Sequence, residues 1–179
     1  LLVDAPYSRD WISRAYLYPE ECIYGLGEQT SGLNRRGTRS RMWNSDPFGA
    51  YQPGDDPIYM PLPIYLGLHQ RGAYLVFYEN YHPATFQFDR QSDLQRDKRP
   101  MARAKFEGGA LRYYFISGEP AKAVQTLSKL IGRPSLPPRW SLGYHQSRWG
   151  YKSEQDIRQV VDGFKEYDLP LSALHLDID

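Results

Sequence analysis

The sequence lacks the features that mark several functional classes. Its one cysteine, Cys22, leaves no possibility of a disulfide within the chain and gives no sign of an oxidised, secreted scaffold. No apolar run is long enough to cross a membrane. The formal net charge of +1 provides no field that would attract nucleic acid or acidic lipid. We therefore expect neither nucleic acid nor a membrane as a partner, and a cytoplasmic location is favoured.

Sequence motifs for cofactors and metals are missing as well. The chain has no glycine-rich phosphate loop, no cysteine and histidine spacing suited to a metal, and no nucleophile elbow. Its 4 histidines are scattered, and nothing pairs them with a serine or cysteine nucleophile. The sequence thus predicts no cofactor and no metal site.

Aromatic residues and short apolar segments are abundant instead. Aromatics make up 15% of the chain, with 15 tyrosines and 4 tryptophans, which is typical of β-rich folds and also suits stacking on sugar rings. Up to about residue 117, the short apolar segments are bounded by turn residues, which favours an antiparallel β-sandwich. The predicted strands span residues 12–17, 64–68, 73–78, 85–88 and 111–116. Residues 30–56 are rich in Gly, Arg, Asn, Asp and Pro, and we expect a long functional loop there.

The character of the sequence changes after Ser117. Pro120 suits the first position of a helix, and apolar residues follow at helical spacing, which predicts a helix over residues 120–131. Prolines between residues 133 and 138 predict a stiff, extended crossing. We therefore predict a β-sandwich at 1–117, a linker helix with a proline-rich crossing at 118–137, and a different domain at 138–179.

The final segment has the pattern strand, helix, strand. A strand is predicted at 141–146, a helix begins after the N-cap Ser153, and a second strand is predicted at 172–179. The helix carries one apolar stripe, formed by Ile157, Val160, Val161 and Phe164. A connection of this length indicates parallel strands with a right-handed crossover, as in the first unit of an α/β barrel.

Acidic residues end the second of these strands. Alternation separates two faces, one with Leu174, Leu176 and Ile178 and the other with His175, Asp177 and Asp179. In a barrel the apolar face packs on helices, so the acids would point inward near the carboxyl end of the strand, where barrel active sites are built. There they could hold sugar hydroxyls or a metal, or take part in acid–base chemistry. Alternatively, they cap the next loop or helix.

Other polar and aromatic residues have two interpretations each. Trp149 follows the preceding strand on the same barrel face, where it either walls a sugar pocket or packs in a core. Asp46 lies in the segment Asn44-Ser45-Asp46-Pro47, where it contacts a ligand or caps a turn as an Asx residue. The basic cluster is better explained by a solvated loop or by acidic neighbours inside the protein than by nucleic acid; it contains Arg35, Arg36, Arg39 and Arg41.

Several short motifs, taken together and in order, resemble glycoside hydrolase family 31. In the first part of the chain they are Gly25-Leu26-Gly27-Glu28, Leu33-Asn34-Arg35-Arg36-Gly37, Trp43-Asn44-Ser45-Asp46, Asp56-Pro57-Ile58-Tyr59 and Pro63-Ile64-Tyr65. In the second part they are Gly132-Arg133-Pro134, Pro137-Pro138-Arg139-Trp140-Ser141-Leu142-Gly143, Arg148-Trp149-Gly150-Tyr151 and Leu176-Asp177-Ile178-Asp179. The family comprises α-glucosidases and their relatives. The resemblance implies a mainly β fold, in which a galactose-mutarotase-like β-sandwich precedes a (β/α)8 TIM barrel.

The resemblance also implies roles for individual residues. Asp177 matches an acid that hydrogen-bonds the sugar, and Ile178 lies beside it in the same pocket. Trp149 matches an aromatic position of that pocket, and Asp46 matches an acid on a sandwich loop that reaches substrate. The family's catalytic aspartates, a nucleophile and an acid/base, are expected beyond Asp179, so no catalytic residue is assigned within the chain and the segment alone is expected to be inactive.

Two rival functions are weighed beside a retaining α-glycosidase acting on an α-linked oligosaccharide or glycoside. The chain could be a non-catalytic carbohydrate-binding sandwich, although such a module has no need of a barrel strand pair. A mutarotase would need a His or Glu acid–base pair inside the sandwich, and the sequence alone identifies none.

Overall fold

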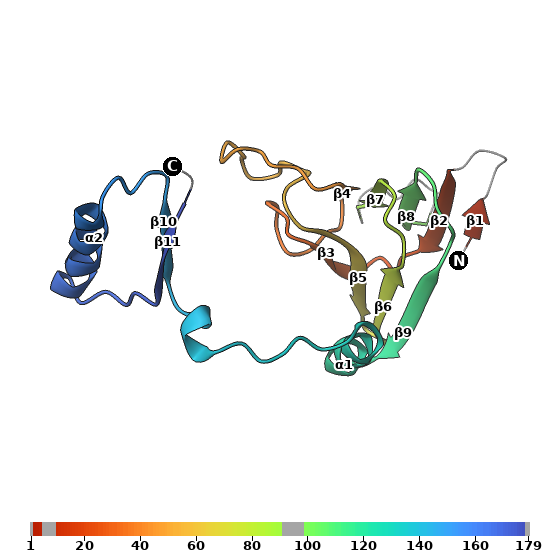
Figure 1. The fold of residues 1–179 in the computed structure, drawn as a ribbon. Coiled ribbons are helices and arrows are strands. Elements are labelled where there is room, and N and C mark those ends of the chain that lie inside the picture. The colour runs from red at the N-terminus through yellow and green to blue at the C-terminus, as the bar shows by residue number, and fades with distance from the viewer. Residues whose placement is uncertain (1, 5–9, 91–98, 178–179) are drawn as a thin grey trace. The chain divides into compact units, whose positions relative to one another are not determined.

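The computed structural model of the chain describes residues 2–4, 10–90 and 99–177. The chain separates into two units, Leu1–Gly132 and Arg133–Asp179, and each is considered by itself (Figure 1). Within the described ranges, none of the helices has the length and apolar character needed to span a bilayer.

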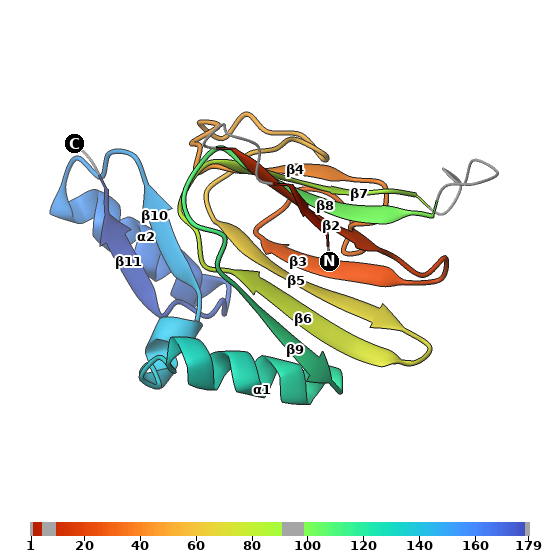
Figure 2. The same cartoon turned by 90° about the vertical axis from the view of Figure 1, so that its right-hand side faces the viewer.

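The first unit is built on two antiparallel sheets. One has the strand order β1 (Leu2–Asp4), β2 (Trp11–Tyr16), β8 (Met101–Phe106), β7 (Ala84–Phe88), β4 (Arg39–Met42). The other has the order β3 (Cys22–Gly27), β5 (Pro61–His69), β6 (Gly72–Tyr78), β9 (Tyr113–Gly118). Figure 2 shows the two sheets stacked face to face. The predicted β-sandwich is confirmed.

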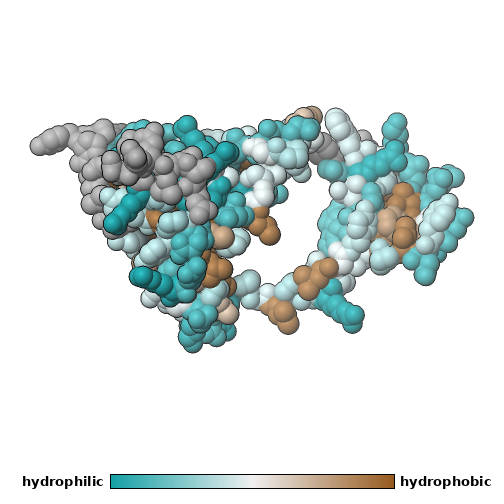
Figure 3. Space-filling view, turned by 180° about the vertical axis from the view of Figure 1, so that it is seen from behind, coloured by the Kyte–Doolittle hydropathy of each residue, from teal (hydrophilic) through white to brown (hydrophobic). Residues whose placement is uncertain are grey.

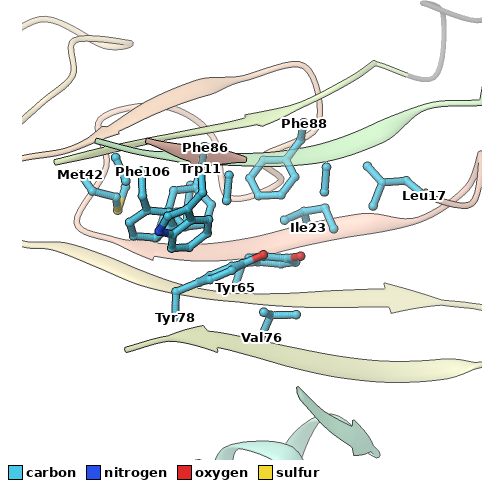
Figure 4. Close-up of a cluster of buried hydrophobic side chains, with 14 residues drawn as sticks. Trp11, Leu17, Ile23, Met42, Tyr65, Val76, Tyr78, Phe86, Phe88 and Phe106 are labelled. Carbon is cyan, nitrogen blue, oxygen red and sulfur yellow. The ribbon is translucent and has the colours of Figure 1, made fainter. Parts of the chain in front are cut away.

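Alternation along β6 divides two cores. Val76 and Tyr78 point between the sheets, where aromatic side chains cluster (Figure 4). In that cluster the rings of Trp11 and Phe106 stack with centroids 4.3 Å apart. Leu75 lies on the opposite face of β6 and belongs to a second, smaller cluster. Burial on both faces explains why β6 is apolar along nearly its whole length rather than at every second residue.

Helix α1 (Pro120–Ile131) covers the outer face of the second sheet (Figure 2). Its bounds agree with the predicted helix. Pro120 occupies the start of the helix, and the N-cap Glu119 makes no side-chain capping bond. Ala123 and Leu127 are buried against Leu75. Burial of an apolar stripe, rather than capping, thus holds α1 in place.

Four strands of the sandwich escaped the sequence analysis. These are β1, β3, β4 and β8, and β4 shows that the prediction of an uninterrupted loop over residues 30–56 was wrong. In β3, a Cβ at Gly25 would lie 2.6 Å from Ile64 O, and one at Gly27 would lie 2.1 Å from Met60 O. These glycines allow close approach to β5 at a bulge, so residues typical of turns hid a strand.

The second unit contains a short 3-10 helix (Arg139–Leu142), β10 (His145–Arg148), α2 (Glu154–Glu166) and β11 (Ala173–Leu176). Strands β10 and β11 are parallel, as predicted. The predicted strand at 141–146 was wrong over its first part, because turn bonds from Ser141 N to Pro138 O (3.0 Å) and from Gly143 N to Trp140 O (3.1 Å) close the 3-10 helix there.

Helix α2 lies on one face of the β10–β11 pair (Figures 1 and 2). Ser153 and Asp156 form a capping box at its N-terminus, with bonds of 3.0 and 3.2 Å. The apolar stripe of the helix is only half-buried, and no side chain between residues 133 and 177 is fully buried. Apolar side chains accordingly lie exposed on this unit as well as on the sandwich (Figure 3).

Candidate functional site

The carboxyl edge of β10 and β11 holds two of the predicted site residues. Arg148 pairs with Leu176 as the last step of the parallel register, so Trp149 and Asp177 follow at the same edge of the strand pair. Asp177 is exposed, and Trp149 is 72% exposed. This edge combines a flat ring with a carboxylate, as the sequence analysis expected. Ile178 and Asp179 lie outside the described residues.

A histidine pair lies on the strand face that carries Asp177. Nδ1 of His145 and Nε2 of His175 are 2.9 Å apart, and the two rings stack with centroids separated by 5.1 Å. Trp140 also stacks on His145, with ring centroids 5.9 Å apart. The sequence analysis treated these histidines as scattered. The signal that would have joined them is the parallel register, because His145 pairs with Ala173 and His175 is two residues further along the same face.

Asp46 lies in the exposed loop between β4 and β5. Its Oδ1 accepts hydrogen bonds from Phe48 N (2.8 Å) and from the Tyr59 hydroxyl (2.9 Å). The first bond is an Asx turn, which confirms that structural interpretation of Asp46. The second raises the pKa of Tyr59, because the phenol donates to a carboxylate that would repel a phenolate.

Hydrogen bonds link the two ends of the loop around Asp46, and the loop carries exposed rings. Ser45 N donates to Ile58 O (3.1 Å), and Asn44 Nδ2 donates to Tyr59 O (2.5 Å). The exposed aromatic side chains of this stretch are Trp43, Phe48, Tyr51 and Tyr59. Rings that present an apolar face beside a carboxylate provide the contacts that a sugar requires: stacking on its apolar face and hydrogen bonds to its hydroxyls.

Members of the arginine cluster have partners within the sandwich. Arg35 is buried, and its guanidinium donates to Ser31 Oγ (2.6 Å) and to Gly32 O (2.8 Å), so the solvated-loop interpretation was wrong for this residue. Burial lowers the pKa of Arg35. Arg41 pairs with Glu107, which agrees with the expectation of acidic neighbours.

The described residues show two groups of candidate contacts. Trp149 and Asp177 come together at one strand edge, and Asp46 lies on a loop of the other unit. Over residues 2–4, 10–90 and 99–177, no three His, Cys, Asp or Glu side chains gather in a way that could hold a metal ion. The chemistry that these groups offer is hydrogen bonding and stacking.

Comparison with known proteins identifies both parts of the chain. Residues 10–87 match the model of the glycosyl hydrolase 31 N-terminal galactose mutarotase-like domain. Residues 134–179 match the model of the glycosyl hydrolases family 31 TIM-barrel domain. Together the two matches cover more than half of the chain, in the order that the fold requires.

Curated relatives are similar over most of this chain. Alpha-glucosidase 2 of Bacillus thermoamyloliquefaciens is 37% identical over 157 residues, which is 87% of this chain and 19% of that protein. Lysosomal alpha-glucosidase of Rattus norvegicus is 34% identical over 165 residues, which is 90% of this chain and 16% of that protein. The chain thus spans about a fifth or less of the length of these relatives.

Solved structures agree with these relatives. The dextranase FjDex31A of Flavobacterium johnsoniae, a GH31 enzyme complexed with glucose, superposes with a TM-score of 0.82 at 28% identity, over 98% of this chain and 20% of that chain. The family 31 alpha-glucosidase from Bacteroides thetaiotaomicron superposes with a TM-score of 0.75 at 24% identity, over 98% of this chain and 29% of that chain, which shows the shared fold. This chain belongs to glycoside hydrolase family 31, of which it carries the N-terminal mutarotase-like domain and the beginning of the TIM-barrel domain.

Proposed function

We propose that the chain is the N-terminal part of a retaining α-glycosidase, similar to the α-glucosidases, that hydrolyses O-glycosyl bonds of α-linked oligosaccharides or glycosides in carbohydrate metabolism. One observation carries this proposal: a family 31 sandwich is followed, in the same chain, by the opening parallel strands of a family 31 barrel. A carbohydrate-binding module would need only the first of these.

The part of the work proposed for this segment is to position substrate. In retaining hydrolysis one carboxylate attacks C1 and a second group protonates the leaving oxygen, with about 5–5.5 Å between the two carboxyl groups. Both groups are expected beyond Asp179, as the family resemblance implies. Asp177 would accept hydrogen bonds from sugar hydroxyls, Trp149 would stack on the ring, and Ile178 would line the same pocket. Fixing the sugar in this way lowers the entropic cost of bringing C1 in line with the nucleophile.

Asp46 is proposed to contact the same sugar from the sandwich loop. Support comes from the exposed aromatic rings around it and from the ties that fix the loop. In the complete protein we expect the carboxylates of Asp46 and Asp177 to face one substrate site. Coordinates of the complete protein in complex with a sugar, with Asp46 on the far side of the sandwich, would disprove this role.

The domain division is part of the proposal: a sandwich at 1–117, a linking helix and crossing at 118–137, and the barrel from 138. Helix α1 contacts β6 and β9, so the linking helix is attached to the sandwich. In this scheme the proline-rich crossing carries the chain from one domain to the next.

The test is to assay the complete gene product and the 179-residue chain side by side on aryl α-glucosides, following nitrophenol release. We expect turnover by the complete protein and none above a no-enzyme control by the chain alone. Binding of sugar without turnover by the complete protein would favour the carbohydrate-binding alternative. Turnover by the chain alone would show that catalytic groups lie within these residues.

A further inference from the structure

The sandwich contains a cavity whose lining includes none of the candidate contacts described above. It has a volume of about 530 Å³ and lies between β2 of one sheet and β6 and β9 of the other. This size falls within the roughly 300–1,000 Å³ of small-molecule sites. Its floor is the end of the aromatic core, where Tyr65 and Val76 are buried.

Exposed aromatic rings form the walls of this cavity. Phe115 is 60% exposed and stacks on Tyr74, with ring centroids 5.3 Å apart. Tyr16 and Tyr18 on the β2 side are 58% and 41% exposed. Large rings usually bury most of their area in a domain, so a group of exposed rings around a hollow indicates a surface that is covered when a ligand binds.

A buried carboxylate supplies the cavity with hydrogen-bond acceptors. Glu21 is only 3% exposed, and its carboxylate accepts from Tyr18 N (2.8 Å) and from the Tyr74 hydroxyl. Burial, followed by this bond to Glu21, raises the pKa of Tyr74 and keeps its phenol a donor. Each carboxylate oxygen is thereby oriented and retains a lone pair for a ligand hydroxyl.

His69 adds a donor to the same lining. Its Nδ1 accepts from Arg71 N at 3.2 Å, so a neutral ring carries its proton on Nε2. The imidazole lies 4.6 Å from the Tyr18 ring and 6.3 Å from the Tyr74 ring, centroid to centroid. The Glu21 carboxylate and the His69 imidazole therefore both contact Tyr18 and Tyr74. Glu21 and His69 are 48 positions apart, which is why this His and Glu combination was not found from the sequence.

The charges around the cavity favour a neutral ligand. Guanidinium groups of Arg71 and Arg99 lie over the Tyr18 and Tyr16 rings, at 5.5 and 5.7 Å from their centroids. Arg36 donates to the backbone carbonyl of Glu21 at 2.9 Å. These three positive groups disfavour a cation, and the Glu21 carboxylate disfavours an anion. A ligand with apolar faces and many neutral hydroxyls fits both restrictions.

We propose that this cavity is a second saccharide-binding site, which takes one pyranose ring between Tyr16 and Phe115 with its hydroxyls on Glu21 and His69. The site lies wholly within the sandwich and uses none of the residues assigned to substrate positioning. It shares no residue with the groups proposed to position substrate, so it adds to the proposed function and does not depend on it.

The test is a titration of the ¹⁵N-labelled 179-residue chain with maltotriose and, separately, isomaltotriose, followed by amide chemical shifts. We expect saturable shifts at Tyr18, Glu21 and Phe115. Tyr16→Ala and Phe115→Ala should each weaken binding about fivefold or more, as expected when a central contact residue is truncated. Both side chains are exposed, so shifts remote from the cavity should stay as in the wild type and show that the fold is kept.

Tyr81→Ala is the matched control, because Tyr81 is 96% exposed on the same unit and does not line the cavity. This variant should bind as the wild type does. The proposal is overturned if neither sugar produces saturable shifts, if the shifts fall only on residues 43–60 or 133–179, or if Tyr81→Ala loses as much affinity as Tyr16→Ala. Binding of choline in place of sugar would also overturn it. Each outcome is independent of the turnover assay, so the two proposals can fail separately.

Discussion

Different interactions stabilise each of the two units of the chain. In the sandwich, rings and aliphatic side chains are buried between the sheets and beneath α1. In residues 133–177, the apolar stripe of α2 is half-buried at most. The stabilising contacts there include the hydrogen bonds of a parallel strand pair and a capping box at the start of α2. Burial of one large side chain contributes about 1.5–3 kcal/mol, whereas a helix cap contributes about 1 kcal/mol.

This difference in burial indicates which unit can be stable by itself. The sandwich has its own core, and its sheets pair internally. In the described residues of the second unit, β10 and β11 pair only with each other, so each leaves one edge unpaired. We expect the sandwich to carry the cooperative stability of the chain and residues 141–179 to be cleaved first by proteases.

The largest expected effect comes from breaking the sandwich core. Phe106 is 0% exposed and packs on Trp11 and Tyr78, with ring centroids 4.3 and 5.4 Å away. Phe106→Ala should lower the free energy of unfolding by about 3–5 kcal/mol, since it removes contacts and leaves a cavity. Urea unfolding of the chain, followed by near-UV circular dichroism, measures this loss.

Two phenylalanines serve as controls for that experiment. Phe48 is 85% exposed, so Phe48→Ala should change stability by no more than about 0.5 kcal/mol. Phe164 on α2 is half-buried, and its ring centroid lies 5.6 Å from that of Tyr144. Phe164→Ala should leave the sandwich transition unchanged. Equal losses for Phe106→Ala and Phe164→Ala would show that the two units unfold as one and would refute the comparison.

The next effect concerns activity rather than stability. In the complete enzyme, Asp177→Asn should keep the fold and lower kcat/KM about 10- to 150-fold, because a hydrogen bond to a charged group contributes about 1.5–3 kcal/mol. Asp162→Asn is the matched control on exposed α2, where Asp162 pairs weakly with Lys165 at 3.7 Å, and its kinetics should equal those of the wild type. Unchanged kinetics for a folded Asp177→Asn enzyme would reject the positioning role.

Sequence patterns predicted the elements whose apolar residues follow a simple local pattern. Helix α1 was found because its apolar residues recur at helical spacing, and strand β6 because it is a short apolar run bounded by turn residues. Strand β3 was missed because Gly25 and Gly27 serve a close approach to β5, and β4 because its buried residues, Ser40 and Met42, alternate with arginines.

Contacts between distant residues were beyond the reach of those patterns. The alternation in β11 and the family resemblance together singled out Asp177, and the structure puts Trp149 at the same edge. The histidine pair depends on strand register, and the contact of Glu21 with Tyr74 depends on how the connection between β2 and β3 packs on β6. Both depend on pairing and packing between segments that are distant in the sequence, which the period of one segment does not specify. The substrate roles of Asp46, Trp149, Asp177 and Ile178 stay predictions.

A smaller effect is expected when the residue that precedes each helix is replaced, and it should differ between α2 and α1. Ser153→Ala removes the capping box of α2 and should cost about 1 kcal/mol of local helix stability, measured by amide hydrogen exchange in α2. Glu119→Ala at the start of α1 should cost less than about 0.5 kcal/mol, because Glu119 makes no side-chain cap and burial holds that helix. A larger loss of helix stability for Glu119→Ala than for Ser153→Ala would contradict the conclusion that capping stabilises α2 and burial stabilises α1.

The smallest expected effect is a pH dependence on the exposed loop of the sandwich. The Tyr59 hydroxyl donates to Asp46 at 2.9 Å, and this bond raises the pKa of Tyr59 above its ordinary value of about 10. A pKa raised in the folded state means that the bond's contribution is complete below about pH 10 and is lost as the pH rises through the higher, folded value. Asp46→Asn should bring the pKa of Tyr59 back toward its ordinary value, observed by the ¹³Cζ shift of Tyr59 against pH. Asp55→Asn is the matched control, because the Asp55 carboxylate accepts from Gln52 N instead. If Tyr59 titrates alike in the wild type and in Asp46→Asn, the loop around Asp46 is not fixed by this bond, and the fixed position proposed for its carboxylate loses that support.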